Sequence, residues 1–425
     1  MTKFNEIIHF ACVIDEREFM KKKNQPYYLY PFLILLILGC VKEEVVSKST
    51  SYILKTEVWP SDENGKILPS QGEYDPFTVK SIYARPEPGW IFDRWEGAIS
   101  GKDNPKAISF YDNLAIRAVF IKDTFKVRTI AGGHGKGSEL NQFHYPTGIA
   151  LDPSGDLYVS DMFNHRIQRW KPGATVGITA AGGNGYGSSP SQLEEPGKID
   201  IDSQGNIYIA DTGNNRIQKW EYGGLSGSTV AGGNGMGNGL NQLNKPFGIA
   251  VDNKGTIYIS ELGNHRVSMW KKGASSGTVI AGGNGEGNRP DQLAIPMGIA
   301  VNNNGDLFVA DTYNHRIQLW EKGATEGKTL ISSKDFKSET PLNYFSGISI
   351  VDESVLYITD YQQKRILRYD LNTEHFEIIS ANEMLDNEAD QLAQPYQTAI
   401  DVMGDLIIAD AKNNRIQKRK IKLNE

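Results

Sequence analysis

Six acidic residues, each five positions before an arginine, are the side chains whose type and spacing could support chemistry. A carboxylate beside an arginine can act as a general acid or base, or it can brace a turn through a charge-assisted hydrogen bond. A catalytic pair would not be needed six times, so we expect a structural role. The pairs are Asp161/Arg166, Asp211/Arg216, Glu261/Arg266, Asp311/Arg316, Asp360/Arg365 and Asp410/Arg415.

Three histidines next to these arginines, His165, His265 and His315, could be metal ligands. They occupy the same place in different copies of a repeat, whereas a zinc–nitrogen bond is only about 2.0–2.1 Å long. Residues on separate turns cannot share one ion at that distance. The equivalent Asn215, Lys364 and Asn414 do not complete a ligand set either. We expect turn residues, with no metal site and no cofactor.

Glycine-rich loops beginning at Gly132, Gly182, Gly232 and Gly282 superficially resemble phosphate-binding loops. A phosphate-binding loop opens a helix after a strand. These loops lead instead into another predicted strand. We therefore expect connections between structural units, in which glycine supplies positive backbone angles.

A repeat of about fifty residues must position all these groups. Within each copy, period-two alternation of apolar residues predicts short strands, separated by turn-forming residues. Four antiparallel strands per copy predict an all-β, six-bladed β-propeller. Strand Phe125–Ala131 would be the fourth strand of the last blade, because the last copy ends after its third strand. The copies are Pro146–Trp170, Pro196–Trp220, Pro246–Trp270, Pro296–Trp320, Phe345–Tyr369 and Pro395–Arg419.

The run Asn164-His165-Arg166-Ile167, with its copies, resembles the signature of the NHL repeat family over residues 125–421. The fifth copy departs most, since Gln363-Lys364-Arg365 replaces Asn-His-Arg. The resemblance implies a propeller, and animal relatives bind RNA or protein. The formal charge of −6 and the lack of a Lys/Arg run in the repeats argue against nucleic acid here.

Enzymes with similar blades, such as the peptidylglycine amidating lyases, place metal-binding histidines just after the position of Pro146. The matching residues here include Thr147 and Tyr396 but no histidine. Gluconolactonase-like propellers use acids and an asparagine in the central channel. Only the second copy offers something comparable, Lys198 and Asp200, which share a strand face and could pair with each other. Thr147, Lys198 and Asp200 are the channel candidates.

Chain alternation places the second-to-third turn of each blade and the crossover to the next blade on one side of the ring, here called the crossover face. Large side chains gather at its variable positions, as a binding surface requires. The predicted binding residues are Lys136, Met162, Phe163, Tyr186, Met236, Leu262, Glu286, Tyr313 and Tyr361.

The N-terminal part resembles a bacterial lipoprotein precursor. Residues 20–39 read as a signal peptide whose end, Ile37-Leu38-Gly39-Cys40, resembles a lipobox, so Cys40 would carry the lipid. Residues 1–19 would be a misplaced start, with Met20 as the alternative to Met1, and 40–50 a tether. Residues 51–123 resemble a divergent internalin-type B repeat, a small β spacer whose aromatic residues fill a core. The propeller would occupy 124–425.

The sequence therefore predicts a lipid-anchored envelope protein, periplasmic or surface-facing, that binds a protein or a glycan through the crossover face. A metal-dependent lyase or lactonase acting in the central channel is the alternative. The oligomeric state stays open.

Overall fold

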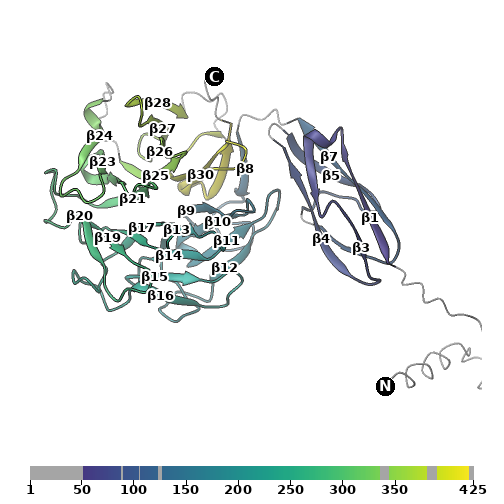
Figure 1. Cartoon of the computed structure of the whole chain (residues 1–425), viewed down its shortest axis with the longest axis horizontal. Helices are drawn as coiled ribbons and strands as arrows, with labels where there is room; N and C mark the ends of the chain where they lie inside the picture. Colours follow the sequence, from purple (N-terminus) through teal and green to yellow (C-terminus); the bar gives the residue numbers. More distant parts are fainter. Residues whose placement is uncertain are drawn as a thin grey trace, which may run out of the picture. The chain divides into compact units, whose positions relative to one another are not determined.

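The computed structural model describes residues 51–87, 90–104, 106–122, 127–335, 344–380 and 390–420. The predicted signal peptide and Cys40 lie outside these ranges. Within them the chain is all-β with a few short 3-10 helices (Figure 1). No helix of the described part is long and apolar enough to cross a membrane.

Residues 52–122 form two small sheets around one core. One sheet has the strand order β3-β1-β7-β5 and the other β2-β4-β6. Trp95 is buried among Leu54, Ile82 and Phe120, and Phe92 packs against the same cluster. Trp90, Phe92 and Trp95 therefore belong to a core, as predicted. The strands are β1 Tyr52–Trp59, β2 Gly65–Leu68, β3 Gln71–Tyr74, β4 Val79–Pro86, β5 Trp90–Gly97, β6 Lys106–Ser109 and β7 Leu114–Lys122.

Six four-stranded antiparallel sheets follow between Val127 and Arg419. Sheet 1 holds β9 Pro146–Leu151, β10 Leu157–Asp161, β11 Arg166–Trp170 and β12 Ile178–Gly182. Sheet 2 holds β13 Pro196–Ile201, β14 Ile207–Asp211, β15 Arg216–Trp220 and β16 Gly227–Gly232. Sheet 3 holds β17 Pro246–Val251, β18 Ile257–Glu261, β19 Arg266–Trp270 and β20 Thr278–Gly282. Sheet 4 holds β21 Pro296–Val301, β22 Leu307–Asp311, β23 Arg316–Trp320 and β24 Lys328–Ser332. Sheet 5 holds β25 Phe345–Val351, β26 Val355–Asp360, β27 Arg365–Asp370 and β28 His375–Ser380. Sheet 6 holds β29 Pro395–Ile400, β30 Leu406–Asp410 and β31 Arg415–Arg419, with β8 Val127–Gly132 as its fourth strand.

The pairing of β8 with β31 joins the start of this region to its end. Val127 lies opposite Arg419 and Gly132 opposite Arg415, in antiparallel register. This confirms the predicted place of the strand before the first repeat. The pairing removes an open sheet edge, because the last repeat supplies only three strands of its own.

The first strands of the six sheets follow one another in space. Each contacts the first strand of the next sheet, and β29 also contacts β9. Apolar side chains fill the interfaces between successive sheets. Trp170 of β11, for example, packs with Phe143 and with Ile416 of sheet 6. The repeated tryptophans therefore stabilise packing between sheets, as expected from the large apolar area of an indole ring.

Candidate functional site

The six acid–arginine pairs form buried ion pairs at the turn between the second and third strands. Their shortest nitrogen–oxygen distances range from 2.6 to 2.9 Å. Each acid is fully buried. In sheet 1, Asp161 and Arg166 are directly opposite each other in the β10–β11 pairing. The sequence spacing of five thus corresponds to one closing pair of a hairpin.

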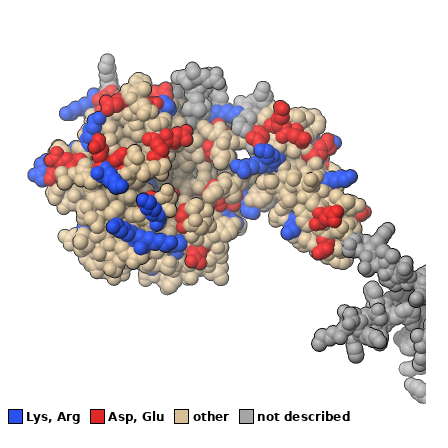
Figure 2. Space-filling view, viewed as in Figure 1, with Lys and Arg blue, Asp and Glu red and all other residues tan. Residues whose placement is uncertain are grey.

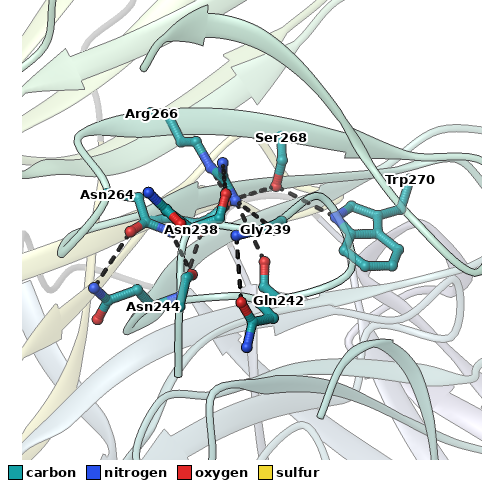
Figure 3. A network of polar contacts seen from close by, with 10 residues as sticks. Asn238, Gly239, Gln242, Asn244, Asn264, Arg266, Ser268 and Trp270 are labelled. Carbon is teal, nitrogen blue, oxygen red and sulfur yellow. Dashed lines mark hydrogen bonds and ion pairs between the residues drawn. The ribbon is translucent and has the colours of Figure 1, made fainter. Parts of the chain in front are cut away.

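The arginines also hold the crossover loops. In sheet 3, Arg266 donates from Nη1 to the Asn238 carbonyl at 2.8 Å and from Nη2 to the Gly239 carbonyl at 3.3 Å (Figure 3). Ser268 extends this network by donating to the Glu261 carboxylate. One guanidinium therefore ties the hairpin turn to the crossover loop, which confirms that both lie on one side of the sheets. The described pairs form a structural frame.

Four of the residues that precede these arginines have a role that the sequence did not reveal, namely His165, Asn215, His265 and Asn414. His165 has φ 53°, and its Nδ1 accepts a hydrogen bond from the Glu195 backbone N–H at 3.1 Å. Asn215 likewise has φ 52° and accepts from the Lys245 N–H through Oδ1 at 2.9 Å. Nδ1 of histidine and Oδ1 of asparagine are equally far from the backbone. Either side chain can therefore accept a hydrogen bond from the backbone N–H just before the next sheet, which explains why His and Asn alternate at this position. The histidines are turn residues, as predicted.

The glycine-rich loops are connections between sheets. Gly132 has φ +69°, and a Cβ there would lie 2.7 Å from the Asn414 carbonyl oxygen. Only glycine fits such a close approach with that backbone angle. Among the described residues, no three His, Cys, Asp or Glu side chains are grouped so that they could hold a metal ion.

Lys198 lies in β13, the first strand of sheet 2. It is 2% exposed, and its Nζ donates to the Ser346 carbonyl on β25 at 2.5 Å. The bond therefore links sheet 2 with sheet 5. Burial lowers the pKa of Lys198 to about 7, because water no longer stabilises the ammonium. Thr147, the first channel candidate, is also buried and donates to the Gly197 carbonyl at 3.2 Å.

Asp200 borders a cavity of about 980 Å³ lined by aliphatic side chains from the first strands of all six sheets. Its carboxylate accepts hydrogen bonds from the backbone N–H groups of Val251 at 2.7 Å and Ile201 at 2.8 Å. Burial raises its pKa to about 6. The alternative that Lys198 and Asp200 pair with each other is not found among the contacts of the described residues. Lys198 binds the Ser346 carbonyl of β25, and Asp200 binds backbone N–H groups of β17 and of its own strand.

A continuous series of six aromatic rings in mutual contact, here called the aromatic row, lies on the crossover face. Successive ring centroids are 5.5 to 5.8 Å apart. The row comes from sheets 1, 6, 5 and 4, whose first strands are neighbours. Phe247 of β17 reaches the same row, with its ring 6.4 Å from that of Tyr396. In order, the members are Phe163, Tyr145, Tyr396, Tyr361, Tyr344 and Tyr313.

The row is held by backbone hydrogen bonds and is open to solvent at its ends. The N–H groups of Phe163, Tyr313 and Tyr361 donate to carbonyls just before the first strand of their own sheet, each at 3.1 Å. Phe163 is 40% exposed and Tyr313 53%. Tyr145 and Tyr396 are partly buried. Rings fixed in this way lose little conformational freedom when a ligand binds.

The row is electrically neutral near pH 7. Burial raises the pKa of Tyr361 to about 12 and raises that of Tyr396 further. Burial also lowers the pKa of His144, whose ring contacts Phe163 at 4.9 Å. The phenols of Tyr361 and Tyr396 therefore stay protonated and can donate hydrogen bonds.

Three of the predicted binding residues, Phe163, Tyr313 and Tyr361, belong to the aromatic row. Met162 and Leu262 are only partly exposed. The four loop residues Lys136, Tyr186, Met236 and Glu286 are exposed, and each forms an equivalent isolated bridge with an apolar residue of its own loop, apart from the row.

Sequence reasoning missed Tyr145 and Tyr344 as site residues and treated Tyr396 only as a non-ligand. Tyr145 and Tyr344 both stand directly before a first strand. That position varies among the copies, with Glu195, Lys245 and Ile295 in others. The variation of this position among otherwise similar copies was the signal that could have found them.

Comparisons with known proteins identify the repeat. The NHL repeat family matches residues 143–170, 193–220 and 293–319. No curated protein sequence matches the chain. A structural genomics protein of unknown function from Bacteroides thetaiotaomicron is similar in structure, with a TM-score of 0.55 at 14% identity over 82% of this chain and 98% of that one.

Two enzymes are also similar in structure. A gluconolactonase from Xanthomonas campestris has a TM-score of 0.50 at 14% identity, covering 70% of this chain and 96% of its own. Virginiamycin B lyase from Staphylococcus aureus has a TM-score of 0.46 at 15% identity over 70% and 99%. At such identity the likeness extends to fold alone. The chain thus carries NHL repeats in a β-propeller fold.

Proposed function

We propose that this chain is a binding protein of the bacterial cell envelope, in which the six sheets are the blades of one NHL propeller. The aromatic row would contact the partner, an envelope protein or a glycan. The observation that carries the proposal is the continuity of the row across four sheets. Aromatic rings supply most of the contact energy at many interfaces, at a low cost in side-chain entropy.

The anchor in this proposal is a lipid on Cys40, which would keep the propeller at a membrane surface. The lipobox-like end of the apolar segment supports it. We expect the mature chain to begin at Cys40 and to carry acyl chains. Intact-mass measurement of protein extracted from membranes checks this, and a mature chain that keeps residues 20–39 would contradict it.

Charge placed on the two exposed ends of the row tests the binding role. We expect Phe163→Asp with Tyr313→Asp to abolish partner capture from envelope extracts, because an aspartate at each end cannot be desolvated against a ligand. Circular dichroism and the melting temperature should stay near those of the wild type, since both side chains are largely exposed.

The matched control is Tyr222→Asp. Tyr222 is 59% exposed and lies in the third-to-fourth strand turn of sheet 2, on the side opposite the crossover face. Capture that survives in the double variant, or that is lost equally in the control, would refute the role of the row. An enzyme acting in the central cavity, the competing proposal, would keep its activity in the double variant.

A further inference from the structure

We infer that the ligand of the aromatic row is an uncharged polysaccharide chain, an inference that rests on the row being the binding site proposed above. Three properties of the row support it: the contact of each ring with the next, the uncharged side chains, and the tyrosine hydroxyl groups along the row.

The order of contacts from one ring to the next along the row fits a chain-like ligand. The ring contacts run in the order Phe163, Tyr145, Tyr396, Tyr361, Tyr344, Tyr313. Phe247 adds a ring beside Tyr396, and His315 adds one beside Tyr344. A polysaccharide presents successive ring-shaped units whose C–H faces pack on aromatic faces. A globular protein partner would instead favour a compact apolar centre with a polar rim. The row instead continues from ring to ring over sheets 1, 6, 5 and 4, and its two end rings are exposed.

Neutrality and hydroxyl groups match the polar part of a sugar. Five of the six rings are tyrosines, and the raised pKa of Tyr361 and Tyr396 keeps those phenols protonated. Tyr145 shows how the hydroxyls are used, since its OH donates to Gln394 Oε1 at 2.7 Å. A tyrosine thus offers an apolar face and a hydrogen-bonding edge together, as a sugar ring does.

Single-stranded nucleic acid also stacks on aromatic series, but such sites combine stacking with a positively charged groove for the phosphates. The six rings themselves carry no lysine or arginine, and one exposed lysine, Lys412, occupies the sheet 6 turn position equivalent to Phe163. Figure 2 shows both acidic and basic side chains on the face in view. The formal charge of −6 points the same way. Charge therefore favours a neutral chain over a polyanion.

The test measures binding of neutral hexasaccharides to the purified full-length protein by isothermal titration calorimetry. The probes are the β-linked hexasaccharides of glucose, mannose and xylose and the α-linked hexasaccharide of glucose, each at up to about 1 mM. We expect at least one to bind, and Tyr361→Ala to weaken it about tenfold or more, because this substitution interrupts the row. Tyr222→Ala, on the opposite side, should leave the affinity unchanged.

The outcomes separate this inference from the proposed function. Binding that Tyr361→Ala weakens and Tyr222→Ala does not supports the inference. It is overturned if no hexasaccharide binds, or if Tyr361→Ala binds as the wild type does. Two results would leave the row a binding site but overturn the polysaccharide inference. One is that protease destroys the partner captured through Phe163 and Tyr313. The other is that a twelve-nucleotide single-stranded DNA binds instead of the hexasaccharides. If the charged variant still captures its partner, the proposed function itself fails.

Discussion

The crossover face has two different halves built on one repeat. In sheets 1, 4, 5 and 6 the turns and first strands carry the aromatic row. In sheets 2 and 3 the residue at the position of Phe163 is glycine, Gly213 and Gly263. A Cβ at Gly213 would lie 2.4 Å from Glu194 Cγ. The glycine half is closed by side chains of the preceding segment and leaves no room for a ring.

The frame beneath both halves is the same. The Asp161–Arg166 pair of the aromatic half measures 2.8 Å and the Asp211–Arg216 pair of the glycine half 2.7 Å. Both arginines also donate to crossover carbonyls, Ser138 and Ser188, at 2.7 Å. The difference between the halves therefore resides in side chains of two places: the turn directly after the acid of a constant ion pair, and the start of the first strand. In such a repeat, function is found where the copies differ.

The largest expected effect comes from breaking that common frame. Arg166→Met and Arg216→Met each leave a fully buried carboxylate without its partner, which typically costs about 3–5 kcal/mol. We expect both variants to lower the free energy of unfolding by similar amounts, measured by urea denaturation. Although the two halves differ in surface, their frames should be equally sensitive.

The two sites are far apart, so each loss of unfolding free energy reports on its own half. A difference of more than about 1 kcal/mol between the two losses would contradict the expected equality. The double variant Asp161→Asn with Arg166→Met is the matched control. It removes both charges, so it should recover part of the loss. Recovery would show that the buried charge, rather than the lost packing of the arginine, dominates the cost.

Much of the fold could be predicted from the sequence because its information is local and repeated. The turn residues, the alternation of apolar side chains and the spacing of the acid–arginine pairs recur in every copy, and each copy tests the others. The closing strand β8 could be placed because sheet 6 lacked one strand of its own. The prediction of four strands per repeat is confirmed by the pairing of the described strands.

The binding site could be predicted only in part, for a physical reason. Phe163, Tyr313 and Tyr361 stand in turns, where an exposed aromatic residue is conspicuous. Tyr145, Tyr344 and Tyr396 stand in or beside first strands, where an aromatic residue is ordinarily part of a core. Their assembly into one row depends on contacts between sheets, and sequence patterning within a copy does not report those contacts. The same limit left the partners of Lys198 and Asp200 open, because both side chains bind strands of other sheets.

Lys198 offers a smaller and more specific test, because it is a link between the two halves. Its hydrogen bond to the Ser346 carbonyl joins β13 of the glycine half to β25 of the aromatic half. In the folded protein its pKa is about 7, below its ordinary 10.5. Between these values the unfolded chain holds a proton that the folded chain has released. The free energy of unfolding should therefore rise with pH across this window, by up to about 1.4 kcal/mol per pH unit.

Lys198→Met keeps most of the side-chain volume and lacks this titration. Between about pH 7 and about pH 8.5 we expect the wild type to gain roughly 2 kcal/mol relative to the variant, measured by urea denaturation at each pH. A wild-type gain that is absent, or reversed, would show that the amine stays charged at the centre of the ring. In that case a buried ammonium, with the Ser346 carbonyl as acceptor, would hold the two halves together at neutral pH. The pH dependence of the unfolding free energy thus decides whether Lys198 donates its hydrogen bond to Ser346 as a neutral amine or as an ammonium.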